Sequence, residues 1–209
     1  LPVLRRWRVT TSQRAGMGDD AGVTAVLTNV RAVLFDVFGT VVDWRSGVIR
    51  GLTAFGANRC LVADLPLIAD QWRAEYQPSM EAVRRGDRPW TILDDLHRES
   101  LARVAARNGI ADLTSSEADE LVQAWHRLDP WPDVVDGLTR LRATHQIGTL
   151  SNGNTTLLCD LARHGALPWD HLLGAETALA YKPLPTAYLR NVALLGLEPS
   201  QVMLAAAHN

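Results

Sequence analysis

The eleven residues from Val30 to Thr40, VRAVLFDVFGT, carry the strongest signal in this chain. They begin with a run of apolar, partly β-branched residues, which predicts a strand buried inside a parallel sheet. The run ends at Asp36, and a glycine turn at Gly39 and the hydroxyl of Thr40 follow. Ligands of open α/β sheets bind beyond the carboxyl ends of the strands, so Asp36 is a candidate nucleophile. The alternative is an aspartate that only caps a turn or a helix.

The composition is that of an ordinary globular protein. Of the 209 residues, 47% are hydrophobic and 21% are charged, and the formal net charge is −2. This balance predicts neither a nucleic-acid partner nor a membrane partner. The two cysteines, Cys60 and Cys159, match no metal spacing and no disulfide framework, which favours a cytoplasmic protein.

The first part of the chain divides into a leader and a helical block. Residues 1–28 show no pattern and lack the apolar region of a secretory signal. They are predicted to be a disordered leader, or else translated sequence upstream of a start at Met17. After Asp36 the apolar spacing becomes helical. The pattern predicts four helices, at Trp44–Ala57, Ala63–Arg85, Trp90–Asn108 and from Ser115 or Ser116 to Leu128. A proline-rich break, DPWPDV, follows at Asp129–Val134.

From Val134 onward, short apolar runs alternate with helical segments. The strands are predicted at Ile147–Leu150, His171–Gly174 and Val202–Ala206, and the helices at Val134–Thr144, Thr155–Gly165 and Pro185–Leu195. Such alternation predicts an α/β fold with a parallel sheet. We therefore expect an α/β core built from residues 29–43 and 131–209. A helical cap, residues 44–130, is inserted after the first strand.

Polar residues follow each predicted strand. Ser151 and Asn152 come after the second strand, Lys182 lies beyond the third, and His208 and Asn209 end the chain after the last. Each alone could be a cap or turn residue. Parallel strands end at one edge of the sheet, so these polar residues are expected to lie near Asp36. Together with Asp36 they predict a site at that edge.

These motifs resemble the haloacid dehalogenase superfamily and, within it, the type II (S)-2-haloacid dehalogenases. The match lies in FDVFGT at Phe35–Thr40, LSNG at Leu150–Gly153 and KP at Lys182–Pro183. The resemblance implies a Rossmann-like core with a cap. Phe38 stands where the superfamily's phosphatases carry a second Asp, which acts as general acid and helps to hold Mg²⁺. The resemblance thus implies hydrolysis of short 2-haloalkanoic acids to 2-hydroxy acids through an aspartyl ester, with no metal, nicotinamide or flavin cofactor.

The resemblance also assigns roles to residues. Asp36 is the expected nucleophile, Lys182 a fixed cation beside it, and Arg73 of QWRAEYQPSM the group that receives the halide. The expected substrate-binding residues are Thr40, Ser151, Asn152, Tyr188 and Asn209, and the expected pocket-lining residues are Phe38, Trp44 and Trp72. Taken singly, Arg73 could be a surface residue, and Tyr188 and the other aromatic residues could be simple core residues.

Two alternatives to an active dehalogenase stay open from the sequence. The family carries an acid beyond the position of Asn209, together with a further strand and helix, and we expect these to be missing here. Ala207 and His208 also depart from the family's usual Ser-Ser-Asn. The alternatives are another hydrolase of the superfamily that acts on a small phosphate ester, or an inactive truncated protein. The family often forms dimers through its cap, so a homodimer is expected as a possible assembly.

Overall fold

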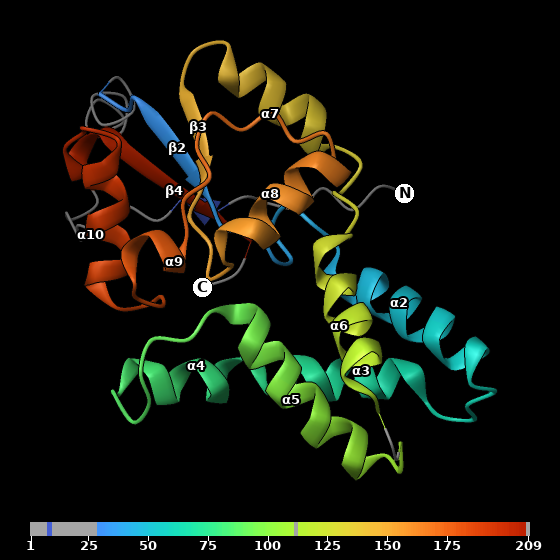
Figure 1. The fold of residues 1–209 in the computed structure, drawn as a ribbon. Helices are drawn as coiled ribbons and strands as arrows, with labels where there is room; N and C mark the ends of the chain where they lie inside the picture. The colour runs from blue at the N-terminus through green and yellow to red at the C-terminus, as the bar shows by residue number, and fades with distance from the viewer. Residues whose placement is uncertain (1–7, 10–28, 111–112, 208–209) are drawn as a thin grey trace.

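The computed structural model describes residues 8–9, 29–110 and 113–207, and its sheet lies at the centre of one half of the molecule (Figure 1). The strands are β1 (Arg8–Val9), β2 (Ala32–Phe35), β3 (Gln146–Thr149) and β4 (Val202–Ala206), in the spatial order β1-β4-β2-β3. Strand β2 is parallel to both β3 and β4. All four residues of β2 are buried, which explains why the sequence there is apolar without alternation. The predicted α/β fold is confirmed.

Helices cover both faces of this sheet. They are α7 (Val134–Arg142), α8 (Thr155–His164), the short α9 (Ala175–Ala178) and α10 (Pro185–Leu194), with a 3₁₀ turn, η2, at Pro199–Gln201. Val33 and Phe35 of β2 belong to one apolar cluster with Leu138 of α7 and Leu157 of α8. Leu34 points to the other face, into a cluster against which Tyr188 of α10 packs.

Two expectations about the sheet were wrong. Arg8–Val9 lies in the predicted disordered leader, yet it pairs antiparallel with β4 at Ala205 and Ala206. The edge of a sheet offers unpaired backbone groups to any extended segment, so no apolar pattern is needed to occupy it. The rest of the leader lies outside the described residues.

The predicted strand at His171–Gly174 forms only isolated bridges, which join His171 to Gly148 and Gly174 to Ser151. Between them, the Thr149 hydroxyl donates to the Leu173 carbonyl (2.7 Å) and accepts from its N–H (2.9 Å). A side chain thus replaces part of the backbone ladder that a continuous strand would have made.

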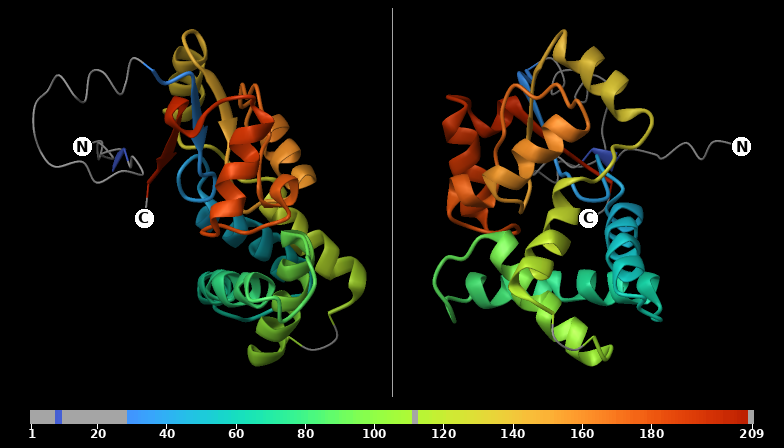
Figure 2. Two further views of the ribbon diagram at one scale, coloured as in Figure 1. Left: turned by 90° about the vertical axis from the view of Figure 1, so that its left-hand side faces the viewer. Right: turned by 45° about the vertical axis from the view of Figure 1, so that its right-hand side comes forward.

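The other half of the molecule is helical and lies beyond the carboxyl ends of β2 and β3 (Figures 1 and 2). It holds α2 (Trp44–Asn58), α3 (Leu65–Ala74), α4 (Tyr76–Arg84), α5 (Leu93–Arg107), α6 (Ser115–Val122) and the 3₁₀ helix η1 (Gln123–His126).

The expected single helix Ala63–Arg85 is divided at Glu75. Pro78 explains the break, because it has no N–H to donate to the carbonyl of Ala74 four residues earlier. Helix α6 is capped by Thr114 rather than by Ser115 or Ser116, in a capping box with Glu117.

The two chain segments that join the halves run side by side. The Asp43 N–H donates to the Asp129 carbonyl (2.9 Å), and the Trp131 N–H donates to the Val41 carbonyl (3.0 Å). Val42 and Pro130 form an isolated antiparallel bridge between these bonds. We propose 44–130 as the cap, because both crossings fall at these boundaries.

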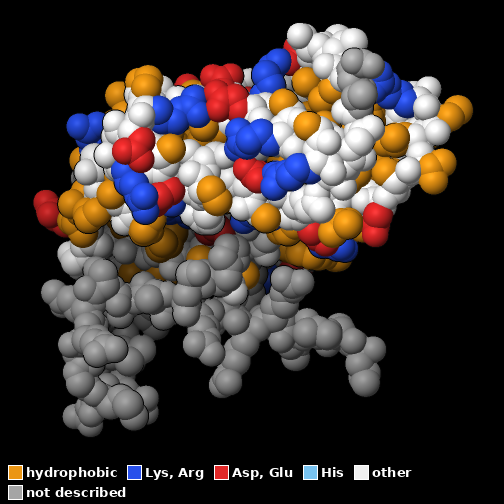
Figure 3. Space-filling model, turned by 90° about the horizontal axis from the view of Figure 1, so that it is seen from below, with side chains coloured by type: hydrophobic (Ala, Val, Ile, Leu, Met, Phe, Trp, Pro, Cys, Tyr) orange, Lys and Arg blue, Asp and Glu red, His pale blue; other side chains and the backbone are white. Residues whose placement is uncertain are grey.

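The outer face on the side of α3, α4 and α5 carries basic and acidic side chains that are interspersed rather than gathered by sign (Figure 3). Within the part of the chain that the structure describes, no helix has the length and apolar character needed to span a membrane.

Candidate active site

Asp36 is held where β2 ends. Its backbone N–H donates to the Ala205 carbonyl of β4 (3.0 Å), and the carbonyl of Phe35 accepts from Leu150 (2.7 Å). The chain then turns through Gly39, whose φ of 83° suits glycine. This rigid setting brings the Thr40 hydroxyl back to the Asp36 side chain, where it donates to Oδ2 at 2.9 Å.

Lys182 completes this group from a distant part of the sequence. Its Nζ lies 2.9 Å from Asp36 Oδ1, and both side chains are about 85% buried, with exposures of 15% for Lys182 and 14% for Asp36. The Thr40 hydroxyl also accepts the N–H of Ala207, just after β4. Groups that follow β2 and β4, together with Lys182 from the loop after α9, therefore meet at one carboxylate.

Ser151 and Asn152 support this arrangement from the end of β3. The side-chain oxygen Oδ1 of Asn152 accepts the backbone N–H of Lys182 (2.8 Å), which fixes the loop that carries the lysine. The Ser151 hydroxyl accepts the N–H of Gly153 at 3.2 Å. Both side chains are buried. The structure thus joins Asn152 to the loop of Lys182 and places Ser151 next to Asn152 at the end of β3, and the roles of both in substrate binding stay predictions.

Arg73 lies in the last turn of α3, and aromatic rings surround its guanidinium group. The guanidinium carbon is 3.9 Å from the centroid of Tyr76 and 5.3 Å from that of Trp44. One of its nitrogens, Nη1, is buried and has no hydrogen-bond partner among the described residues. A buried cationic N–H without a partner is suited to an anion.

The predicted pocket residues belong to one aromatic cluster around Arg73. Phe38 is buried and meets the rings of Tyr76 (6.4 Å between centroids) and Trp125 (6.0 Å) edge-on. Trp44 stacks on Trp125 at 6.1 Å. Trp72 is fully buried and meets Trp125 edge-on at 5.5 Å.

Tyr188 and Asn209 have different outcomes. Tyr188 is half-buried on α10, and burial together with the charge of Asp36 raises the pKa of its hydroxyl. The hydroxyl therefore stays protonated and able to donate near neutral pH. Asn209 lies outside the described residues.

Three residues of the cluster were missed by the sequence analysis: Tyr76, His97 and Trp125. Tyr76 follows Arg73 by three residues, a spacing that places side chains on one side of a helix, so this signal was available. His97 lies on the apolar side of α5 and is 2% exposed. Burial, together with the nearby charge of Arg73, lowers its pKa to about 3, against the opposing effect of Asp94. His97 is therefore neutral under ordinary conditions.

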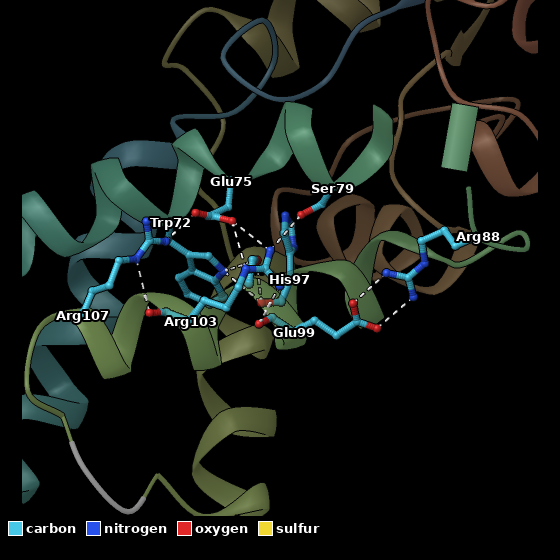
Figure 4. Close-up of polar contacts among 9 residues, drawn as sticks. Trp72, Glu75, Ser79, Arg88, His97, Glu99, Arg103 and Arg107 are labelled. Atoms are coloured by element: carbon cyan, nitrogen blue, oxygen red, sulfur yellow. Dashed lines mark hydrogen bonds and ion pairs between the residues drawn. The ribbon is translucent and has the colours of Figure 1, made fainter. Parts of the chain in front are cut away.

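An ion-pair network on the outside of the cap fixes the position of α3 against α5 (Figure 4). Glu75, at the break between α3 and α4, accepts from Arg103 (2.8 Å) and from Arg107. These bonds lower the pKa of the Glu75 carboxyl despite partial burial. In the buried layer beneath these ion pairs, the Trp72 indole donates to the backbone carbonyl of His97 at 3.0 Å. The network thus anchors the end of α3 that carries Arg73.

A comparison with protein families identifies the class. The family of haloacid dehalogenase-like hydrolases matches residues 30–204, which is most of the chain. The chain belongs to the haloacid dehalogenase-like hydrolases. It is 26% identical over 188 residues to (S)-2-haloacid dehalogenase 4A of Burkholderia cepacia, a match that covers 88% of this chain and 77% of that protein. It is 28% identical to (S)-2-haloacid dehalogenase of Xanthobacter autotrophicus, with coverages of 86% and 68%.

Solved structures of this hydrolase family agree with the fold. The chain is similar to the defluorinating L-2-haloacid dehalogenase Rha0230, with 51% identity and a TM-score of 0.83, over 86% of this chain and 74% of the other. It is also similar to the L-2-haloacid dehalogenase PA0810, with 46% identity and a TM-score of 0.81, over 86% and 77%. The enzyme from Xanthobacter autotrophicus with chloropropionic acid covalently bound is 26% identical, with a TM-score of 0.72, over 83% and 68%.

Proposed function

We propose that this hydrolase converts short 2-haloalkanoic acids to 2-hydroxy acids through an ester on Asp36. The observation that carries the proposal is the carboxylate of Asp36, which is paired with Lys182 and bonded to Thr40 beneath a cap that supplies Arg73. The relatives described as 2-haloacid dehalogenases support the same substrate class. The related structure with covalently bound chloropropionic acid supports a covalent step.

The first step is an in-line displacement. One carboxylate oxygen of Asp36 attacks C2 of the substrate, and the new C–O bond forms as the carbon–halogen bond breaks. The bonding electron pair leaves with the halide, and the carbon inverts. Arg73 stabilises the negative charge that develops on the halide only in this step. Lys182 and Thr40 hold the nucleophile, while Ser151, Asn152 and Tyr188 are the proposed contacts of the substrate carboxylate.

The second step hydrolyses the ester. Water attacks the carboxylate carbon of Asp36, and the bond breaks between that carbon and the Asp36 oxygen that had attacked C2. One proton of the water goes to the oxygen of the departing 2-hydroxy acid, and the other goes to solvent. Asp36 is thereby regenerated with one oxygen from water.

Phe38 favours a carbon–halogen substrate over a phosphate ester. Its side chain is buried against Tyr76 and Trp125 and has no group that could protonate a departing alkoxide. A halide leaves as a stable anion and needs no such proton. Trp44 and Trp72 are the further proposed walls of an apolar pocket that excludes bulk water.

The test is release of chloride from chloroacetate and from each enantiomer of 2-chloropropionate by the full chain, with Asp36→Asn as the inactive variant. We expect many chlorides per chain from the intact protein, a 2-hydroxy acid of inverted configuration, and none from Asp36→Asn. Equal release by both proteins would overturn the proposal. A phosphatase assay with Mg²⁺ then examines the phosphate-ester alternative.

A further inference from the structure

Three side chains of the aromatic cluster hold buried nitrogens without partners. Within the described part of the chain, Arg73 Nη1, Trp125 Nε1 and both ring nitrogens of His97 are buried and make no hydrogen bond. Trp125 and His97 are respectively 0% and 2% exposed. Most buried polar side-chain atoms in proteins have a partner, and leaving one unpaired destabilises the fold.

These three side chains are neighbours. The His97 ring stacks on Trp125 with 4.3 Å between centroids and an interplanar angle of 23°. Trp44 stacks on the same indole and also lies 5.3 Å from the guanidinium carbon of Arg73. Tyr76 contacts Arg73 at 3.9 Å and lies 6.1 Å from His97. The unpaired nitrogens thus come from one continuous cluster.

Packing alone does not explain the unpaired nitrogens. Trp72 is buried in the same cluster, yet its indole donates both to the His97 carbonyl (3.0 Å) and to the Ser100 hydroxyl (3.2 Å). A buried indole N–H in this cluster can therefore find hydrogen-bond acceptors within the protein. The nitrogens of Trp125 and His97 are therefore available to a bound molecule.

The chemistry of the donors restricts what that molecule can be. Arg73 is positive, Trp125 can only donate, and His97, being neutral, offers one N–H. A partner for all three accepts several hydrogen bonds, carries negative charge and is small enough for a site packed with rings. Phe38 connects the cluster to the nucleophile, since it lies 6.0 Å from Trp125 and two residues after Asp36. A halide ion has these properties.

We propose that Trp125 and His97 join Arg73 in receiving the departing halide, and that this donor set allows fluoride, as well as chloride and bromide, to leave. The inference rests on the proposed function. In the reaction the electron pair of the C–F bond passes to fluorine as Asp36 forms its C–O bond, so no further reactant is needed. Fluoride has the most concentrated charge of the halides, and its departure depends most on hydrogen-bond donors.

The test is the rate at which Asp36 becomes esterified in a single turnover with fluoroacetate, chloroacetate and bromoacetate. Trp125→Phe removes one N–H and keeps an aromatic ring, and His97→Phe does the same at the imidazole. We expect each variant to slow ester formation from fluoroacetate about tenfold more than from bromoacetate. Trp169→Phe, in the half-buried tryptophan that packs on Phe35, is the control and should slow none of the three selectively.

Several outcomes would overturn the inference. Equal slowing of all three substrates would indicate a purely structural role, and unchanged rates in both variants would exclude the donors. Circular dichroism identifies a variant that fails to fold, and the second variant then decides.

If the intact protein forms no ester from any substrate, the proposed function fails. Binding of fluoride and bromide, followed by halide NMR line widths, then tests the anion site. Weaker binding in Trp125→Phe supports it, and unchanged binding refutes it.

Discussion

His126→Gln is expected to destabilise the protein in a pH-dependent way, because this histidine joins the cap to the core. His126 lies on η1 and is 2% exposed. Its Nδ1 is 2.8 Å from Asp160 of α8, and its Nε2 is 3.1 Å from Asp94 of α5. Asp94 also accepts from Asn154, at the start of α8 (2.8 Å). One imidazole ring thus lies between carboxylates from the two halves of the molecule.

The direction of the pH dependence follows from the pKa of His126. Burial lowers this pKa, but the bonds to Asp94 and Asp160 outweigh burial and raise it above its ordinary 6.5. Because the pKa is raised in the folded state, protonation of His126 stabilises the fold, and this contribution is fully present below the unfolded pKa of 6.5. This contribution is lost as the pH rises through the folded pKa. The pKa of Asp94 is lowered, despite burial, by its bonds to His126 and Asn154, so its contribution is lost only in acid.

The magnitude follows from the burial of the partners. Removing one member of a buried ion pair costs roughly 3–5 kcal/mol. The side chains of Asp94 and Asp160 are 17% and 34% exposed, and glutamine keeps one donor, so we expect a smaller loss. We estimate about 2 kcal/mol at pH 6, which corresponds to a fall in Tm of about 4–8 °C for a chain of this size.

The assay is thermal unfolding of both proteins at pH 6 and pH 9. The difference in Tm should be large at pH 6 and should shrink toward pH 9, as the pH rises through the raised pKa of His126. A difference that is the same at both values would refute the reasoning. His164→Gln is the matched control, because His164 pairs with Asp129 on the surface (2.8 Å) and should contribute less than about 1 kcal/mol.

Three further changes test other parts of the structure. Gly174→Ala should cost about 2 kcal/mol in denaturant unfolding, since an added Cβ would lie 2.6 Å from the Gly153 carbonyl oxygen; unchanged stability would contradict this contact. Arg73→Lys loses the planar group that stacks on Tyr76, and we expect ester formation about tenfold slower with stability little changed; an equal rate would show that any cation suffices. Thr40→Val removes a donor to the nucleophile, and rapid-quench assays should show about tenfold slower ester formation.

The sheet could be predicted where burial leaves a direct trace in the sequence. Ala32–Phe35 and Val202–Ala206 are short, continuous apolar runs, and both were predicted as strands. The strand at Arg8–Val9 could not be predicted, because pairing at an edge depends on backbone groups and not on side chains. The break at Glu75 was within reach, since Pro78 interrupts the helical bonding three residues later.

The residues of the candidate site could also be predicted from the sequence only in part. Asp36, Thr40 and Lys182 could be brought together from sequence because each follows a segment that ends at one edge of a parallel sheet. His97 and Trp125 could not, because their partners come from other helices of the cap and helical spacing says only that they are buried. Their unpaired nitrogens become visible only when every neighbour is in place.

Mass spectrometry of the Asp36 peptide, after a rapid quench of the protein with excess chloroacetate, tests the covalent mechanism most directly. Nucleophilic attack by Asp36 predicts a transient carboxymethyl ester on this residue that forms before hydroxy acid appears. It also predicts that turnover in ¹⁸O-labelled water places the label first in the Asp36 carboxylate. An unmodified Asp36 peptide during turnover, with the label passing directly into the product, would contradict it.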